Sequence, residues 1–415
     1  MISYQDAIET MLSHIRVMDR QEVSMTDSVG RTLADSIRAK FALPAFRNSS
    51  MDGYAFRACD VSGAAKNTPV TLRLVGESKA GTTTIVETLP AKSAISIMTG
   101  GRLPDNADTI LPMEDSHVVD NNLLITNPVT KGMFVRAIGT DWLRDESLMP
   151  EGALLRPEHL PALCAQGVTS LMVYRRPKVV WLSTGPELVD DPNEPLGPSQ
   201  IYNATGFFGN AVLTATGADL VDRYTLGDDN IAFTRSVTQA LNLDADMIIS
   251  TGAVSVGTSD FIRSAAEDMG ATVHVHRVRV RPGKPVLFAT FPNNTIFIGL
   301  PGNPVSTAAS FRMFVTPVLR AMLGQAIEVP FQACLTEDCV VPSNLTVFLR
   351  AQAVITAAHV RIQAAPHQES FKTRSLFGAN AWIIHPEGTA MLKSGSLVSA
   401  LPLWPDSLRI NSATK

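Results

Sequence analysis

Acidic side chains stand in glycine-bearing turns that follow predicted β-strands in the middle of this sequence. Glu187, Asp228 and Asp260 each lie in such a turn. Ligands of an open α/β sheet bind in the crevice beyond the carboxyl ends of its strands, so these turns would converge on one crevice. Carboxylates combined with substrate phosphates are how proteins hold Mg²⁺. Each acid alone is explained as well by a cap, a turn or solvation, but the three together favour a magnesium site.

The third of these turns is the best candidate for binding an anion. It reads Ser250-Thr-Gly-Ala-Val-Ser-Val-Gly-Thr-Ser-Asp260 and places Gly252, Ser255 and Gly257 just before a predicted helix. Free backbone N–H groups and the helix dipole can hold a phosphate there. The spacing copies a nucleotide-triphosphate loop, except that Thr258 stands where that loop has lysine. A tight strand-to-helix connection explains the glycines equally well, and both interpretations stay open.

Cations and a rigid turn lie between two later strands. Arg277, Arg279 and Arg281 alternate along a predicted strand, so their side chains would share one face. Pro282-Gly-Lys-Pro285 then stiffens a turn beside Arg281. Arg281 and Lys284 are the candidates for oxyanion recognition, arginine as a bidentate fork and lysine as a point charge. Arg277 is better explained as part of an exposed polar strand face.

Two further turns have open interpretations. In Gly299-Leu-Pro-Gly-Asn-Pro304, residues Pro301, Gly302 and Pro304 either fix the backbone at the same rim or only shape the start of the last helix. The polar turn at 48–54 is either a binding loop or an Asx-type turn. The histidines and cysteines show neither a triad-like nor a zinc-ligand spacing, so serine hydrolysis and zinc peptidase chemistry have no support.

Composition places the chain among folded, multidomain proteins. It has 415 residues, of which 45% are hydrophobic and 18% charged, which is enough apolar surface for real cores. The net charge of -4 leaves no basic excess for binding nucleic acid or an anionic membrane. The acidic N-terminus lacks a signal-peptide pattern, and no apolar run is long enough to span a membrane, so we expect a cytoplasmic protein.

Hydrophobic periodicity predicts the elements that position these turns. A helix capped by Ser3 opens the chain, short alternating runs follow it, and a second helix runs from Pro157 to a stop at Gly167. From residue 177 strands alternate with helices, which is typical of a doubly wound, mostly parallel sheet. The predicted domains are a helical and linker domain (1–43 and 140–176), an inserted small β domain (44–139), an α/β domain (177–328) and a C-terminal β-barrel-like domain (329–415).

The α/β domain can be predicted in more detail. Apolar runs predict strands over 179–182, 247–250 and 295–298. Helices are predicted to end at Gly217 and Gly270 and to cover 231–241 and 304–323.

The order and spacing of the turns resemble the molybdopterin molybdenumtransferase family, which is related to the C-terminal domain of gephyrin. The resemblance spans nearly the whole chain. The shared stretches are Pro44-Ala-Phe-Arg-Asn-Ser-Ser-Met-Asp-Gly-Tyr-Ala55, Ile97-Met-Thr-Gly-Gly-Arg-Leu-Pro104, Gly139-Thr-Asp141, Ser183-Thr-Gly-Pro-Glu-Leu188, Ser255-Val-Gly257, Pro282-Gly-Lys-Pro285 and Gly299-Leu-Pro-Gly-Asn-Pro-Val-Ser306.

The resemblance implies an enzyme of molybdenum cofactor biosynthesis. In this family the substrates are adenylylated molybdopterin and molybdate, and Mg²⁺-dependent hydrolysis of the phosphoanhydride releases AMP while molybdenum enters the dithiolene. The resemblance also implies a homodimer in which the α/β domain of one subunit and the inserted β domain of the other enclose the site. Implied protein partners are the adenylyltransferase of the preceding step and enzymes that accept the cofactor.

Matched motif by motif, the resemblance also implies roles for individual residues. Glu187, Asp228 and Asp260 resemble the carboxylates that bind metal and phosphate. Asp52, Thr99 and Asp141 would be contributed to catalysis across the dimer. The implied substrate-binding positions are Ser183, Thr184, Gly185, Gly252, Ser255, Gly257, Arg281, Lys284, Pro301, Gly302 and Pro304.

Several positions depart from the family's usual motifs. Pro186 replaces an aspartate, Ala253 a glycine and Arg281 a lysine. Asn203-Ala-Thr-Gly206 stands where relatives have Asp-Ser/Thr-Asn-Arg, and so lacks an acid, an amide and a cation. The transferase is the leading hypothesis. The alternatives are a diverged, catalytically weak homologue that binds pterin or acts as a scaffold, and an adenylyltransferase that acts one step earlier.

Overall fold

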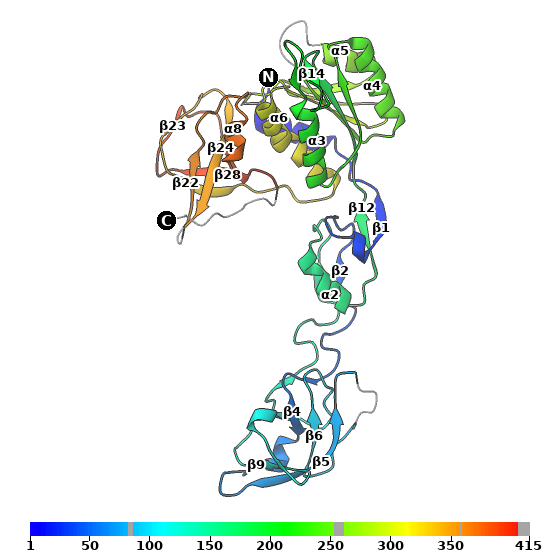
Figure 1. Ribbon diagram of the computed structural model, residues 1–415, viewed down its shortest axis with the longest axis vertical. Coiled ribbons are helices and arrows are strands. Elements are labelled where there is room, and N and C mark those ends of the chain that lie inside the picture. The colour runs from blue at the N-terminus through cyan, green and yellow to red at the C-terminus, as the bar shows by residue number, and fades with distance from the viewer. Residues whose placement is uncertain (82–85, 253–260, 357–358, 406–415) are drawn as a thin grey trace. The chain divides into compact units, whose positions relative to one another are not determined.

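A computed structural model describes residues 1–81, 86–252, 261–356 and 359–405 (Figure 1). The chain divides into two compact units. The first comprises Met1–Asp35, Glu151–Pro157 and Ser170–Lys415, and the second comprises Ser36–Pro150 and Glu158–Thr169. The predicted class, a multidomain protein with α/β and β parts, is confirmed. None of the helices in the described ranges is long and apolar enough to cross a membrane.

A six-stranded sheet forms the centre of the first unit. The first three strand pairings across the sheet are parallel and the last two are antiparallel, so the predicted mostly parallel sheet is confirmed. The chain passes from β13 to β16 on one side and then to β17 on the other, which places a topological switch point beyond the carboxyl end of β13. The order across the sheet is β16 (Asp219–Leu226), β13 (Lys178–Thr184), β17 (Met247–Thr251), β21 (Ile296–Leu300), β20 (Leu287–Thr290) and β18 (Thr272–His276).

Alternate residues of β13 face two separate hydrophobic cores. Val179 and Trp181 belong to one core, and Val180 and Leu182 belong to the other. Strands that are buried on both faces read as continuous apolar runs, which is why β13 and β17 could be predicted. Helices contribute to both cores, as a doubly wound fold requires: α1 (Tyr4–Ser13), α3 (Ala204–Ala215), α6 (Pro304–Ser310) and α7 (Thr316–Met322) to the first, and α4 (Asn230–Asn242) and α5 (Phe261–Asp268) to the second.

The predicted helices are present with small differences at their ends. At the start of α1 the hydroxyl of Ser3 accepts from the backbone N of Asp6 over 3.1 Å, and the Asp6 carboxylate accepts from the backbone N of Ser3 over 3.3 Å. This is the capping box that the sequence predicts. The helix predicted over 304–323 contains a π-helical turn, Phe311–Val315, between α6 and α7.

The strand predicted through the three arginines is wrong. β18 ends at His276, and Arg277 has a φ of 66°, outside the β region. Only β19 (Val280–Arg281) is a strand, and it pairs with β24 (Thr346–Ile355) of the C-terminal barrel. Arg277, Arg279 and Arg281 therefore do not alternate along one strand face.

The predicted C-terminal barrel is confirmed. Five strands close on themselves because β24 pairs with both β25 and β26. Val347, Leu349, Ala351 and Ala353 alternate along β24 and point into its core. The strands in order are β24, β25 (Val360–Ala364), β22 (Phe331–Leu335), β28 (Leu397–Pro402) and β26 (Ala381–His385). Smaller elements of the first unit are β14 (Leu188–Val189), β15 (Ile201–Tyr202), β23 (Cys339–Val340), β27 (Met391–Leu392) and α8 (Arg374–Phe377).

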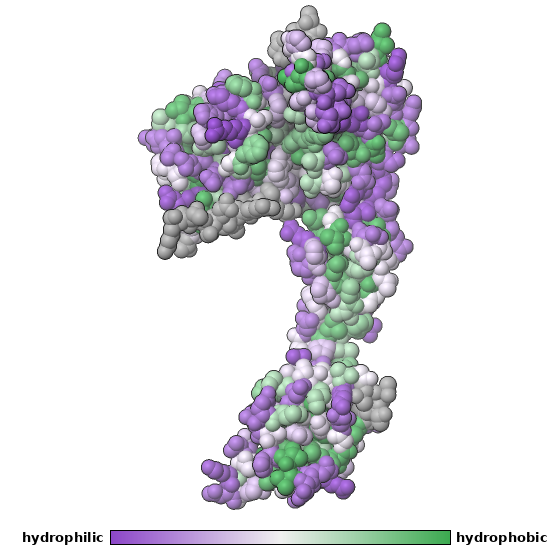
Figure 2. All heavy atoms as spheres, viewed as in Figure 1, coloured by the Kyte–Doolittle hydropathy of each residue, from purple (hydrophilic) through white to green (hydrophobic). Residues whose placement is uncertain are grey.

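The second unit is built on a mixed six-stranded sheet with a core on each face. Val118 and Val119 on its edge strand β8 stay exposed, and Figure 2 shows hydrophobic residues on the surface of this unit. The sheet order is β7 (Thr109–Pro112), β4 (Gly53–Phe56), β6 (Ser93–Ile97), β5 (Val70–Ser78), β9 (Asn122–Ile125) and β8 (His117–Val119). The unit also contains α2 (Leu160–Ala165) and the pairs β2 (Ile37–Arg38) with β11 (Ser147–Met149) and β3 (Asn48–Ser49) with β10 (Val135–Arg136).

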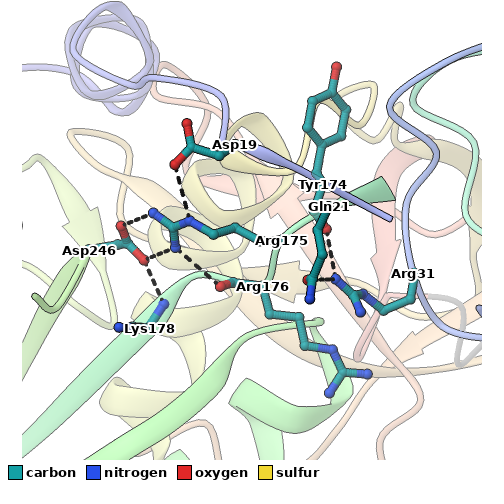
Figure 3. A network of polar contacts seen from close by, with 8 residues as sticks. All are labelled: Asp19, Gln21, Arg31, Tyr174, Arg175, Arg176, Lys178 and Asp246. Atoms are coloured by element: carbon teal, nitrogen blue, oxygen red, sulfur yellow. Dashed lines mark hydrogen bonds and ion pairs between the residues drawn. The ribbon is translucent and has the colours of Figure 1, made fainter. Parts of the chain in front are cut away.

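A charge network ties the ribbon formed by β1 (Arg20–Ser24) and β12 (Ser170–Tyr174) to the amino ends of the sheet strands. Arg175, directly after β12, donates to both carboxylate oxygens of Asp246 over 2.6 and 2.7 Å and contacts Asp19 at 3.4 Å (Figure 3). Asp246 also accepts from the backbone N of Lys178 over 2.7 Å. The hydrogen bond with Asp246 is the main cause of the raised pKa of Arg175.

Replacing Asp246 by asparagine is expected to destabilise the first unit by about 2 kcal/mol, because a neutral amide replaces the acceptor of charge-assisted hydrogen bonds. The Arg175 and Asp246 side chains are 31% and 14% exposed, so water replaces only part of the lost interaction. The urea midpoint of the full chain measures the effect. Asp244→Asn, at an exposed neighbour, is the matched control, and equal midpoints for the two variants would contradict this account.

Candidate functional site

Hydrogen bonds join the turns at the carboxyl ends of the four parallel strands. The backbone N of Gly185, after β13, donates to the carbonyl of Leu226 at the end of β16 over 2.9 Å. The backbone N of Gly252, after β17, donates to the carbonyl of Leu300 at the end of β21 over 3.2 Å. The Thr184 hydroxyl donates to the carbonyl of Thr251 over 3.1 Å, which links β13 to β17. The four turns therefore form one continuous rim at the switch point.

Two glycines allow the turns of this rim to approach each other. Gly252 has a φ of 94°, and a Cβ built on it would lie 2.3 Å from the carbonyl oxygen of Thr184. A Cβ on Gly302 would lie 3.1 Å from the Cα of Gly252. A side chain at Gly252 is thus excluded both by backbone conformation and by the neighbouring turn.

Glu187 and Asp228 lie in adjacent turns of the rim. The Glu187 carboxylate folds over Gly185, because a Cβ on that glycine would be 2.7 Å from Oε2 of Glu187. Asp228 is exposed and follows Leu226 by two residues, where the Gly185 hydrogen bond fixes the end of β16. Neither carboxylate forms an ion pair with any residue that the structure describes.

The third carboxylate of the predicted magnesium site, Asp260, lies outside the described residues, as do Ser255 and Gly257 and the substituted position Ala253. Among the described residues there is no group of three or more histidine, cysteine, aspartate or glutamate side chains that could hold a metal ion. Of the three carboxylates predicted to bind metal, the described residues therefore include only Glu187 and Asp228.

Two serine hydroxyls lie beneath the rim. Ser183 on β13 is fully buried, and so is Ser250 on β17. Neither hydroxyl has a hydrogen-bond partner among the described residues. Ser183 therefore does not reach the solvent-facing side of the rim, where Pro186 and Gly302 are exposed.

The proline-glycine turn presents two free cations. Gly283 has a φ of 100°, and a Cβ there would lie 2.5 Å from Oγ of Ser310. The carbonyl of Lys284 accepts from the backbone N of Val278 and of Val286 over 3.0 and 3.1 Å, which fixes the turn. The side chains of Arg281 and Lys284 are exposed and make no hydrogen bond or ion pair with a described residue.

The turn from Pro301 to Pro304 connects β21 directly to α6. Pro304 occupies the start of the helix, and the Thr307 hydroxyl donates to the carbonyl of Pro301 over 2.6 Å. Asn303 donates to the hydroxyl of Ser370 over 3.4 Å. The prolines therefore shape the start of α6, and they do so at the rim. This is one of the two interpretations that the sequence left open.

The second unit holds the remaining predicted positions. The carboxylate of Asp52 accepts from the backbone N and the hydroxyl of Thr99 over 2.7 and 2.8 Å. These two hydrogen bonds lower the pKa of Asp52, the backbone bond contributing most. Asp141 lies in another loop, where its backbone N donates to the carbonyl of Leu43 over 2.9 Å. The structure thus joins Asp52 to Thr99 and gives no contact of either with Asp141.

Thr99→Val is expected to raise the pKa of Asp52 part of the way toward its ordinary value, because the hydroxyl donor is lost and the backbone donor stays. Since the folded-state pKa is lowered, the carboxylate stabilises the folded unit above the ordinary pKa of aspartate, and this contribution is lost as the pH falls through the lowered pKa. The carboxyl chemical shift of Asp52 against pH is the measurement. Thr68→Val in the same unit is the control, and unchanged titration of Asp52 in Thr99→Val would refute the assignment.

The sequence did not predict a cation whose side chain lies beside the start of α3. Arg223 lies on β16, and its guanidinium stands 5.0 Å from the centroid of the Phe207 ring. The signal was hidden because β16 has a mixed, half-exposed pattern, so its range was not predicted although the turn that follows it was.

Known proteins resemble this chain over nearly its whole length. Residues 2–167 match the MoeA N-terminal region (domain I and II), residues 180–321 match a probable molybdopterin binding domain, and residues 332–403 match the MoeA C-terminal region (domain IV). A molybdopterin molybdenumtransferase of Synechococcus elongatus is 31% identical over 405 residues, covering 97% of this chain and 100% of the relative. One from Bacillus subtilis is 30% identical, covering 99% and 98%. The crystal structure of a molybdopterin biosynthesis MoeA protein from Pyrococcus horikoshii is 25% identical, covers 96% of this chain and 99% of that one, and has a TM-score of 0.82.

Proposed function

The chain belongs to the molybdopterin molybdenumtransferase family, and we propose that it transfers molybdenum from molybdate into adenylylated molybdopterin with Mg²⁺-dependent release of AMP. One observation carries the proposal: full-length similarity to these enzymes coincides with a rim at which Glu187 and Asp228 stand in adjacent turns. The proposal assigns substrate binding to this rim.

The described carboxylates fit a bound Mg²⁺. Glu187 and Asp228 have no cationic partner among the described residues and lie at the carboxyl ends of adjacent strands. Mg²⁺ is commonly held by one or two carboxylates together with substrate phosphates, so two carboxylates suffice for this mode. Bound there, the ion would neutralise phosphate charge as the anhydride breaks.

The protein's own groups bind and orient the substrate. Hydrolysis forms a bond between a water oxygen and a phosphorus atom of the anhydride and breaks the bridging P–O bond, so AMP and the pterin phosphate separate and the proton of the water passes to solvent. Arg281 and Lys284 offer unpaired N–H donors to the phosphate or molybdate oxygens. The turn with Pro301, Gly302 and Pro304 gives the rim a fixed backbone wall, and the Thr184–Thr251 hydrogen bond holds the two central strands in position.

We further propose that two copies of the chain form a homodimer in the cytoplasm. In that assembly Asp52, Thr99 and Asp141 of one copy complete the site of the other, and the adenylyltransferase of the preceding step and cofactor-accepting enzymes are partners. The exposure of Asp52, Thr99 and Asp141 supports their availability to a second copy. A sedimentation mass equal to one chain would exclude the dimer.

The substitution at position 203 leaves the start of α3 capped and hydrogen-bonded. Asn203 caps α3, because its side-chain oxygen Oδ1 accepts from the backbone N of Gly206 over 2.9 Å. Its amide nitrogen donates to Asp190 and to the Thr225 hydroxyl, each over 2.9 Å. No specific observation favours the scaffold or the adenylyltransferase alternative.

The purified chain with adenylylated molybdopterin, Mg²⁺ and molybdate provides the test. We expect AMP and pterin-bound molybdenum to form together, and both to stop when Mg²⁺ is removed by a chelator. Pyrophosphate release that requires ATP would instead support the adenylyltransferase.

A further inference from the structure

Gly206 lies in the first turn of α3, and the guanidinium of Arg223 lies in the space that a side chain at this position would take. A Cβ built on Gly206 would lie 2.9 Å from Nδ2 of Asn203 and 3.2 Å from Nη1 of Arg223. A long side chain at 206 and the guanidinium of Arg223 would therefore compete for the same volume.

Arg223 points toward this turn from the sheet. Arg223 and Thr225 share one face of β16, since side chains alternate along a strand. Thr225 accepts from the side chain of Asn203 over 2.9 Å, which locates that face against the start of α3. The same turn reaches the rim, because the hydroxyls of Thr205 and Thr251 are 3.2 Å apart. Arg223 itself pairs with Trp181 of β13, and its side chain reaches the start of α3, the turn whose Thr205 contacts β17.

The guanidinium of Arg223 has few partners of its own. Its one ion pair, with Asp190, spans 3.9 Å, and Asp190 already accepts from Asn203 over 2.9 Å. Its other contact is the face of Phe207, which is 50% exposed. No hydrogen bond joins the guanidinium to any described residue, although its side chain is only 27% exposed. A pair at this distance contributes little, so the N–H donors remain available to a ligand.

We infer that Arg223 is an oxyanion-binding residue of the site, a cation supplied from β16 beside the start of α3. The inference rests on the proposed function. Its ligand is a tetrahedral oxyanion, which is either the phosphate of the adenylate or molybdate, because the guanidinium fork suits both. Asp190 and Phe207 lie beside the guanidinium, and Gly206 keeps the space open.

Calorimetric titration of the full chain with AMP and, separately, with molybdate tests the inference. Arg223→Leu should weaken binding of at least one of the two anions about tenfold, the loss expected for charge-assisted hydrogen bonds. Weakened AMP binding identifies the phosphate, and weakened molybdate binding identifies molybdate. Arg235→Leu, at an exposed arginine of α4, is the matched control and should change neither.

The double variant Gly206→Arg/Arg223→Leu tests the shared space. It should recover most of the affinity lost in Arg223→Leu, whereas Gly206→Arg alone should be destabilised by crowding against Arg223. Arg223→Lys keeps the charge without the fork and should lie between wild type and Arg223→Leu, which preserves the test if the leucine variant unfolds. Wild-type binding of both anions by Arg223→Leu would overturn the inference, as would a double variant no better than Arg223→Leu.

These outcomes are distinct from failure of the proposed function. If wild-type protein turns over adenylylated molybdopterin and Arg223→Leu binds both anions normally, only the role of Arg223 is lost. If wild-type protein binds neither anion and forms no AMP, both the proposed function and the role of Arg223 are wrong.

Discussion

Asp228→Asn is expected to slow Mg²⁺-dependent AMP release on the order of 100-fold, the size of effect that follows loss of one preorganised electrostatic contact. Asp228 has no ion-pair partner among the described residues, so its carboxylate charge is available to a cation. Removing that charge leaves Glu187 as the one described carboxylate of the proposed metal set. Initial rates of AMP release at saturating substrate and varied Mg²⁺ measure the effect, and excess Mg²⁺ should recover part of the activity.

Asp229→Asn is the matched control for this variant. Asp229 is the exposed neighbour of Asp228 and caps α4 by accepting from the backbone N of Ile231 over 2.9 Å. Asparagine caps a helix about as well as aspartate, so this variant should stay folded and active. If Asp229→Asn and Asp228→Asn lose activity equally, or if neither loses any, the role assigned to Asp228 is wrong.

Gly252→Ala is expected to lower the free energy of unfolding by about 1–3 kcal/mol and to reduce AMP release by a large factor. The added Cβ would sit 2.3 Å from the Thr184 carbonyl oxygen at a φ of 94°, so either β13 or the turn after β17 must move. That movement would break the contact between the turns that form the rim.

The stability part of this prediction is measured by urea unfolding, and the activity part by AMP release at a temperature where the variant is folded. Gly227→Ala is the control, since a Cβ there meets nothing within 4 Å in the neighbouring turn of the same rim. Wild-type stability and activity in Gly252→Ala would show that the rim tolerates displacement.

Much of the fold follows from local pattern. The buried strands β13 and β17 read as apolar runs, and the Ser3 cap, the proline at the start of α6 and the glycine stops delimit helices. The range of β16 could not be predicted because its residues are half-exposed and include Asp222 and Arg223 among apolar neighbours. The arginine strand was wrong because a positive φ at Arg277 ends the pleat, and periodicity carries no information about such a conformation.

Part of the candidate site could likewise be predicted from the sequence, and part of it could not. Turns that follow predicted strands could be assigned to one rim, because parallel topology alone brings them together. The hydrogen bonds that join Gly185 to Leu226 and Asp52 to Thr99, and the position of Arg223 beside Gly206, depend on strand neighbours and turn conformation. No spacing in the sequence encodes those contacts.

The most direct test of the proposed function is a single-turnover reaction of the wild-type chain with adenylylated molybdopterin, Mg²⁺ and molybdate, in which AMP and pterin-bound molybdenum are quantified in the same samples. The account predicts that both products appear at the same rate. Binding of the adenylylated pterin without formation of either product would contradict it.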